Sequence, residues 1–456
     1  MKNYSYLFLF FIFCSSSNLS NDATKNTTST TNVQSPQTQK ENINPAFVHT
    51  YKELEGCNSF LGSENKITCN GDLKIIREFN FNEPISNIYK QNENIIIVFR
   101  TGKIILKNII TENEEILIDL SEKVLFGNES GLFDIAFSKS ENTFLVSYVD
   151  KNSFLNFEIF YFDKNIENII NSEILLKKTA EIAANNRSHF GGKIFWSDYF
   201  NDYLVSFGDF YDSNYDSRLN YLPQDTSSYN GKIIILGTND QLPIINQVRI
   251  SHDNVENIPN IIASGLRHPW QFFEYKDYLV VFDVGLSQNE EVNISRLNNL
   301  PLNFGWPVFE GPKKSSDIDQ IQNYKLEVYL WSGNVRQNAL SYIERNSIFP
   351  AFYYNHSTCD SLALFGRFED CSGNSDIYRG AVIGGDIITN FDSDYYQDIL
   401  FTDYVSGEIF ALNLLNRSLK IVNSEIFNST SLRVFDQTTN QIMLSSNNKI
   451  IIAELP

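Results

Sequence analysis

The stretch Asp398–Leu412, DILFTDYVSGEIFAL, reads as two short apolar strands joined by a turn at Ser406 and Gly407. Short apolar runs separated by glycine and polar turn residues are typical of β-hairpins. The same pattern returns in IIIVFRTGKIILKN at 95–108 and in QIMLSSNNKIIIAEL at 441–455. Hairpins therefore occur in widely separated parts of the chain, and the sequence predicts an all-β protein.

Further short strands lie between these hairpins, and helical heptads are absent. They are expected at Thr143–Val149, Phe157–Phe162, Tyr203–Gly208, Gly231–Leu236 and Tyr278–Asp283. Repeated hairpins suit a sandwich, a barrel or a propeller, and a propeller closes its sheets radially so that few strand edges stay exposed. The pattern favours a propeller, although the repeats are too diverged to place blade boundaries.

Composition limits the possible partners. With 456 residues, 42% hydrophobic and 14% aromatic, the chain has enough apolar surface for a large globular core. Its net charge of -19 would repel a polyanion, so nucleic acid is excluded as a partner and a small molecule is favoured.

The N-terminus has the pattern of an export signal. Lys2 precedes the apolar run Tyr6–Phe13, which is too short for a permanent transmembrane helix, and Cys14 follows. Cys14 is either the acylated cysteine of a lipoprotein or part of a removed signal. We expect a signal peptide at 1–14, a disordered polar linker at 15–44 and a folded body at 45–456, in a protein that is secreted, periplasmic or tethered by lipid.

Four further cysteines form two close pairs. Cys57 lies near Cys69, and Cys359 lies near Cys371. In an exported protein such pairs most simply predict two local disulfides. Zinc binding is the alternative, but neither pair has C-x₂-C spacing.

A histidine motif offers a base. In SHFGGKI at 188–194, two glycines follow His189, and Asp209 ends a strand shortly afterwards. An imidazole can take a hydroxyl proton near neutral pH while a carboxylate fixes its tautomer. The alternative is a histidine that caps a turn, with Asp209 as an ordinary turn residue.

Two later clusters are candidates for ligand and metal binding. In SGLRHPW at 264–270, Pro269 keeps His268 extended, so Arg267 and His268 project to opposite sides; the alternative is a surface arginine beside a core tryptophan. The segments DVGL at 283–286, NEEVN at 289–293 and NFGWP at 303–307 supply the oxygen ligands that calcium prefers, or they are solvated loops.

Taken in order, these motifs resemble those of the soluble quinoprotein glucose and aldose sugar dehydrogenases. The resemblance rests on ESGL at 129–132, SHFGGKI, SGLRHPWQF, DVG with NEEVN, NFGWP, and AVIGGDI with LFTDYVSGEIFAL, and runs from about Lys74 to the C-terminus. The segments GAVIGG and DYVSGEIF are also similar to hedgehog-interacting-type propellers.

The resemblance implies a six-bladed β-propeller that binds pyrroloquinoline quinone (PQQ) and calcium. It implies oxidation of an aldose at C1 to the lactone, with electrons passed on to an exported acceptor. His189 would be the general base and Asp209 its support, while Glu129, Arg267, His268 and Trp270 would contact the cofactor. A fixed cation at Arg267 suits this chemistry, because reduction builds negative charge on quinone oxygen.

The resemblance also implies calcium ligation, and the sequence departs from the family pattern at three places. Backbone carbonyls at Gly285 and Leu286 would bind calcium, and Glu291 would join a structural calcium site. His268 replaces the asparagine of an Arg-Asn-Pro motif, Val405 stands where the glucose-oxidising branch has a lysine, and only Arg433 lies near its paired C-terminal arginines.

The sequence leaves one alternative to the dehydrogenase and disfavours a third function. A secreted sugar- or protein-binding propeller that has lost the cofactor is the alternative. A hydrolase is disfavoured because no serine lies in a G-x-S-x-G turn.

Overall fold

The structure is a computed structural model, and it describes the chain in several stretches. These are residues 67–161, 176–181, 188–211, 222–237, 260–314, 343–355 and 379–456, apart from single positions or pairs within them, together with two short N-terminal strands. Those strands, β1 (Tyr51–Glu53) and β2 (Phe60–Gly62), pair antiparallel. No helix in these stretches is long and apolar enough to cross a membrane.

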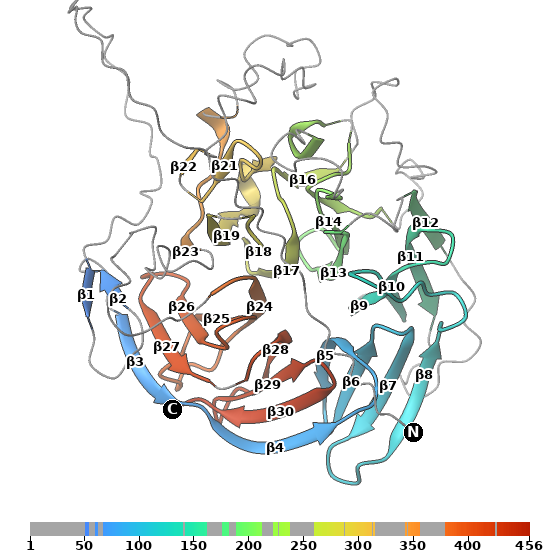
Figure 1. The fold of residues 1–456 in the computed structure, drawn as a ribbon, viewed down its shortest axis with the longest axis horizontal. Helices are drawn as coiled ribbons and strands as arrows, with labels where there is room; N and C mark the ends of the chain where they lie inside the picture. Colours follow the sequence, from blue (N-terminus) through green and yellow to red (C-terminus); the bar gives the residue numbers. More distant parts are fainter. Residues whose placement is uncertain are drawn as a thin grey trace, which may run out of the picture. The chain divides into compact units, whose positions relative to one another are not determined.

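Six sheets of four or five strands form the blades of a β-propeller, which confirms the predicted fold (Figure 1). Short turns join some successive strands within a blade, such as β6 to β7 and β29 to β30, as the hairpin pattern predicts, whereas other connections, such as β14 to β15, are long. Blade one contains β5 (Ile85–Gln91), β6 (Asn94–Phe99), β7 (Lys103–Asn108) and β8 (Glu114–Asp119). Blade two contains β9 (Leu132–Phe137), β10 (Thr143–Val149), β11 (Phe154–Tyr161) and β12 (Leu176–Glu181). Blade three contains β13 (Gly191–Ser197), β14 (Asp202–Phe207), β15 (Lys232–Ile235), β16 (Ile261–Ser264) and β20 (Leu302–Asn303).

The remaining blades follow the same order from the centre outward. Blade four contains β17 (Pro269–Tyr275), β18 (Tyr278–Asp283), β19 (Asn289–Arg296) and β23 (Phe352–Asn355). Blade five contains β24 (Val382–Ile387), β25 (Asp398–Asp403), β26 (Ile409–Asn413), β27 (Leu419–Asn423) and β3 (Ile67–Asp72). Blade six contains β28 (Ser429–Asp436), β29 (Gln441–Ser446), β30 (Lys449–Glu454) and β4 (Lys74–Asn80). A short hairpin of β21 (Phe309–Glu310) and β22 (Lys313–Lys314) stands outside the blades.

The first strand of every blade lines the centre of a closed ring. Each of these strands contacts the first strand of the next blade, in the cycle β5, β9, β13, β17, β24, β28 and back to β5. Side chains on the second and third strands of neighbouring blades pack face to face between these strands and the rim. Between blades four and five, for example, Phe401 lies 5.8 Å from Phe282 and 5.1 Å from Phe410, measured between ring centroids.

The N-terminal part of the folded body fastens the ring. β4 pairs antiparallel with β30 as the outer strand of blade six, and β3 pairs parallel with β27 on blade five. One continuous segment thus adds the outermost strand to two neighbouring blades. The ring holds its central loops in fixed positions, and the site below is built on those loops.

Candidate functional site

His189 lies on a strained turn at the inner end of blade three. Its φ is 55°, and Gly191 and Gly192 follow with φ of 71° and 74°. The turn also passes very close to Gly208, where a Cβ would lie 1.9 Å from the carbonyl oxygen of His189. Only glycine permits this approach. The glycine residues therefore fix the place of the imidazole.

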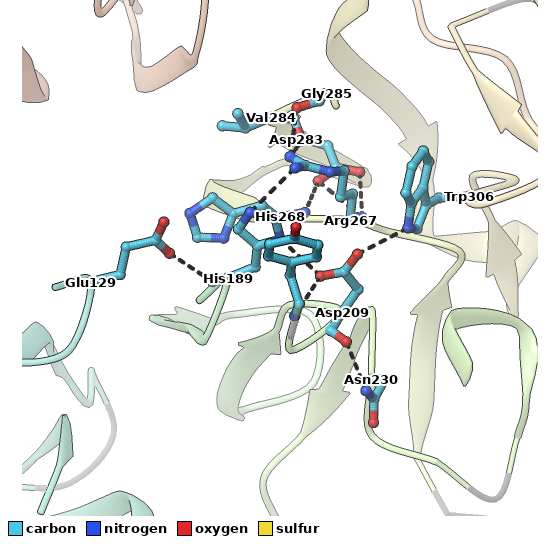
Figure 2. A network of polar contacts seen from close by, with 11 residues as sticks. Glu129, His189, Asp209, Asn230, Arg267, His268, Asp283, Val284, Gly285 and Trp306 are labelled. Atoms are coloured by element: carbon cyan, nitrogen blue, oxygen red, sulfur yellow. Dashed lines mark hydrogen bonds and ion pairs between the residues drawn. The ribbon is translucent and has the colours of Figure 1, made fainter. Parts of the chain in front are cut away.

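A buried carboxylate orients the His189 ring. Asp209 Oδ1 lies 2.9 Å from His189 Nδ1, and Trp306 Nε1 donates to Asp209 Oδ2 at 3.2 Å (Figure 2). Asp209 is fully buried, and the amide of Asn230 donates to its backbone carbonyl at 2.8 Å. A carboxylate only accepts hydrogen bonds, so Nδ1 carries the proton and Nε2 keeps its lone pair. This is the tautomer that a general base requires.

Arg267 lies on the other side of the imidazole. Its Nη2 is 3.2 Å from His189 Nε2, and its Nη1 donates to the carbonyl oxygens of Val284 at 2.9 Å and Gly285 at 2.5 Å. Asp283 holds the backbone here, because its carboxylate accepts from the N–H groups of Arg267 and His268 at 2.9 and 2.7 Å. The guanidinium therefore joins the base to the Val284–Gly285 loop (Figure 2).

His268 is buried with part of its hydrogen-bonding capacity unused. Its ring centroid lies 4.9 Å from that of His189 and 5.4 Å from that of Trp270. Burial, and then the neighbouring His189, Arg267 and Lys193, hold the pKa of His268 well below its usual range. Its Nδ1 and the Nε of Arg267 have no partner in the part of the chain described. Buried polar atoms normally have partners, so both are available to a ligand.

Glu129 approaches the same site from blade two. Its Oε2 accepts a hydrogen bond of 2.6 Å from the backbone N–H of His189. Arg100, which donates to the carbonyl oxygens of Asn128 and Ser130 at 2.5 and 3.0 Å, lies close enough for its charge to interact with Glu129. Two loops from neighbouring blades thus meet at the imidazole.

Comparisons with known proteins bear on the fold. No family model matches the chain. The HIPL1 protein of Arabidopsis thaliana is 35% identical over 106 residues, which are 23% of this chain and 13% of that protein. This match agrees with the resemblance to hedgehog-interacting-type propellers, but it spans a small part of the relative's length.

Solved structures match over most of the chain. A glucose dehydrogenase is 11% identical, with a TM-score of 0.56 over 83% of this chain and 99% of its own. The soluble aldose sugar dehydrogenase of Escherichia coli, in its apo form, is 12% identical, with a TM-score of 0.54 over 84% and 99%. A putative oxidoreductase (glucose dehydrogenase) of Thermus thermophilus is 14% identical, with a TM-score of 0.51 over 83% and 99%.

The chain has the fold of the soluble sugar dehydrogenases. Within this sugar dehydrogenase fold, the structure gathers six of the residues singled out from sequence around one imidazole. They are Glu129, His189, Asp209, Arg267, His268 and Gly285. Trp270 lies beside His268, and its Nε1 donates to the carbonyl oxygen of Thr430 at 3.1 Å.

The residues expected to bind calcium make contacts with other protein groups in this structure. The Val284 and Gly285 carbonyl oxygens converge on one cationic atom, Arg267 Nη1, so they are arranged to bind positive charge. Leu286 presents its N–H to Glu310 Oε1 at 2.8 Å. The carboxylate of Glu291 bonds to the N–H of Gly311 and the amide of Asn293, and the described residues contain no cluster of three or more His, Cys, Asp or Glu suited to a metal.

Sequence reasoning missed two contacts of the His189–Asp209 pair. Tyr211 stacks on His189 with ring centroids 5.3 Å apart, and Trp306 bonds to Asp209. Trp306 belongs to the NFGWP motif, which predicts metal binding and carries part of the family resemblance but does not point to a contact with Asp209, whereas nothing near Tyr211 signals its contact with His189. Cys14, Cys57, Cys359 and Cys371 lie outside the described residues, so the disulfides and the lipid anchor stay predictions, as do the boundaries at residues 14 and 44; Cys69 lies on β3.

Proposed function

We propose that this propeller is a quinone-dependent dehydrogenase that oxidises the C1 hydroxyl of an aldose to the lactone. The observation that carries the proposal is the His189 imidazole, whose Nδ1 is held by Asp209 and whose Nε2 faces Arg267. The motif resemblance supports PQQ as the cofactor, and the fold is the one that glucose and aldose dehydrogenases use.

The residues at the site could divide the reaction between them. The sugar hydroxyl would replace Arg267 Nη2 as the hydrogen-bond donor to His189 Nε2, which then takes the hydroxyl proton. Asp209 stabilises the resulting imidazolium through Nδ1. PQQ, when bound, would supply a two-electron acceptor for the hydride that leaves C1, so that the C–O single bond becomes the lactone carbonyl.

The charge of Arg267 and two unpartnered nitrogen atoms at the site fit an anionic cofactor. Arg267 carries positive charge and an unpartnered Nε, and His268 has an unpartnered Nδ1. Arg267 would stabilise negative charge that develops on an oxygen of the ligand. Calcium would bind the Val284 and Gly285 carbonyls in competition with Arg267 Nη1, because both cations need the same oxygens. We expect Glu129 and Trp270 to border the ligand.

The test is a titration of the purified, calcium-loaded protein with PQQ, followed by a panel of aldoses while the quinone absorbance is recorded. Binding, followed by sugar-driven reduction, would support the proposal and give the substrate class. Binding without reduction by any aldose would exclude a sugar dehydrogenase. If the protein is a sugar dehydrogenase, its reduced cofactor would pass electrons to an acceptor outside the cytoplasm, because the chain is expected to be exported.

A second function is favoured by one specific residue. Val405, where the glucose-oxidising branch has a lysine, offers no cation; its N–H donates to Asp403 Oδ1 at 2.9 Å. If PQQ does not bind at micromolar concentration, a non-catalytic sugar- or protein-binding propeller becomes the better description.

A further inference from the structure

Lys193 is a buried cation that no carboxylate of the described chain neutralises directly. It lies on β13, four residues after His189, and only 3% of it is exposed. Its Nζ makes one hydrogen bond, a long one of 3.3 Å to the carbonyl oxygen of Phe133, and lies 4.9 Å from the ring centroid of Trp270. An ammonium group carries three donors, so two are unused within the described residues.

The charges around Lys193 leave an excess of positive charge. The carboxylate of Asp134 attracts the Lys193 ammonium group, while Arg433 and Arg100 repel it. Asp134 is already committed, because Oδ1 accepts from Asn87 at 2.8 Å and from Tyr89 at 2.5 Å, and Oδ2 accepts from the N–H of Ile194 at 3.0 Å. Lys193, Arg433 and Arg100 therefore share Asp134, whose oxygens are both in use, and the second carboxylate of the group, Glu129, interacts with Arg100.

The two arginines have partners of their own. Arg433 donates to the carbonyl oxygens of Gly385 at 3.1 Å and Ile88 at 3.3 Å, and Arg100 donates to the Asn128 and Ser130 carbonyls. Lys193 is thus the cation of this group with donors to spare. It is also near enough to His268 for its charge to lower the pKa of that imidazole, so it belongs to the edge of the same site.

A second buried lysine shows what a purely structural lysine looks like here. Lys232 on β15 is fully buried, and its Nζ donates to three carbonyl oxygens, those of Leu222 at 3.1 Å, Pro223 at 2.8 Å and Asn230 at 2.7 Å. All three donors are satisfied. Burying a cation without such partners is costly, so the unused donors of Lys193, unlike those of Lys232, are free to bind the acceptor groups of a ligand.

We propose that Lys193 binds a carboxylate of an aromatic ligand, with Trp270 and the free Nδ1 of His268 beside it. The ligand class is an aromatic or quinonoid acid, and under the proposed function it is the cofactor itself. The inference rests on that function for the identity of the ligand but not for the anion site. Lys193 would thus supply a cation for the cofactor, which Val405 cannot supply where the glucose-oxidising branch has a lysine.

The experiment compares PQQ with its trimethyl ester, which lacks the negative charges, in calorimetric titrations. Lys193→Met is expected to weaken PQQ binding about 10- to 100-fold, the usual worth of a charged hydrogen bond, and to leave ester affinity within about threefold. Lys193→Arg should keep most of the preference for the acid. Lys232→Met is the matched control; it should lower thermal stability and leave the acid-to-ester ratio unchanged.

The pH dependence gives a readout that a merely structural lysine would not produce. Burial, with Arg433 and Arg100, lowers the pKa of Lys193 to about 8. An anion binds the charged form, so PQQ affinity should be highest below pH 8 and should fall as pH rises through 8. The Lys193→Met protein should show a flat profile over the same range, and a wild-type profile just as flat would count against the proposal.

The outcomes separate the two proposals. Equal PQQ affinity in wild type and Lys193→Met would overturn the anion site and leave the dehydrogenase standing. If wild type does not bind PQQ but binds benzene-1,3-dicarboxylate in a Lys193-dependent way, the site stands and the PQQ-dependent function fails. If neither acid binds, both fail. Should Lys193→Met not fold, the Lys193→Arg and wild-type pH profiles decide.

Discussion

His189 is held on both sides of its ring, and the two sides have different expected functions. Asp209 fixes the tautomer, whereas Arg267 lies where charge would develop on a ligand. His189→Ala should reduce turnover by at least about 10³-fold while PQQ affinity changes little, because a general base acts only in the chemical step. Single-turnover absorbance and calorimetry on the same samples measure the two quantities.

Arg267→Ala should weaken both cofactor affinity and turnover, since under the proposed function the guanidinium would contact the cofactor, and it joins His189 to the Val284 and Gly285 carbonyls. Asn230→Ala offers a comparison near the site, because the hydrogen bonds of the Asn230 side chain within the described residues go to the backbone carbonyl of Asp209 and to Ser228 rather than to His189 or Arg267. Equal loss of cofactor binding in the His189 and Arg267 variants would contradict the separate roles.

Gly208 keeps the imidazole in place by allowing the backbone of His189 to pass very close to it. Gly208→Ala would put a methyl group 1.9 Å from the His189 carbonyl oxygen, so the turn must move. We expect destabilisation of about 1–3 kcal/mol and a loss of turnover that approaches that of His189→Ala. Gly127→Ala, where no atom lies within 4 Å of the added Cβ, should change neither. Thermal melts and turnover assays together check this; normal activity in Gly208→Ala would show that the turn is tolerant.

The sequence identified most of the residues at this site because each lies in a short motif whose spacing is local. It could not identify the bond between Arg267 and His189, which joins residues 78 positions apart. Tyr211 was likewise invisible, because stacking depends on where two loops meet in space. Motifs therefore predicted which residues gather, while the folded ring decides which atoms touch.

Among the strand elements, β10 and β18, the second strands of their blades, were predicted with the ends that they have in the structure, because both of their faces are covered by neighbouring blades and they read as continuous apolar runs. β11 was expected from Phe157 but begins at Phe154, and β19, the third strand of blade four, was not predicted. None of the six inner strands was predicted. They carry the buried polar residues of the centre, such as Asn87, Asp134 and Arg433, which interrupt the apolar pattern.

The aromatic layer between blades four and five should be sensitive to truncation. Phe401 is fully buried and packs against Phe282, Phe352 and Phe410 with ring centroids 5.1 to 5.8 Å away. Phe401→Ala should cost about 3–5 kcal/mol of unfolding free energy, measured by chemical denaturation. Phe391→Ala, at a ring that is 78% exposed, is the matched control and should stay within about 0.5 kcal/mol of wild type. A similar loss in both variants would mean that the layer adds no special stability.

At the scale of the whole molecule, the ring depends on its N-terminal segment. Removing residues 1–72 deletes β3 but leaves β4 on blade six, so the ring should still close with a lower melting temperature. Removing residues 1–80 also deletes β4 and exposes the edge of β30, which favours aggregation. Near-ultraviolet circular dichroism and size-exclusion chromatography distinguish the two products, and a monomeric native protein after the longer deletion would show that closure does not need β4.

The pairing of β4 with β30 also determines when blade six can be completed during synthesis of the chain. Glu78 and Lys449 are ion-paired although 371 residues separate them. At about 5–20 residues per second, β4 emerges roughly 20–70 s before its partner is made and must wait without it. Blade six is then completed last, and only a chain that extends through β30 can complete it. The closing strand thus works as a check for completeness, because a prematurely ended chain keeps an open edge that proteases and chaperones can recognise.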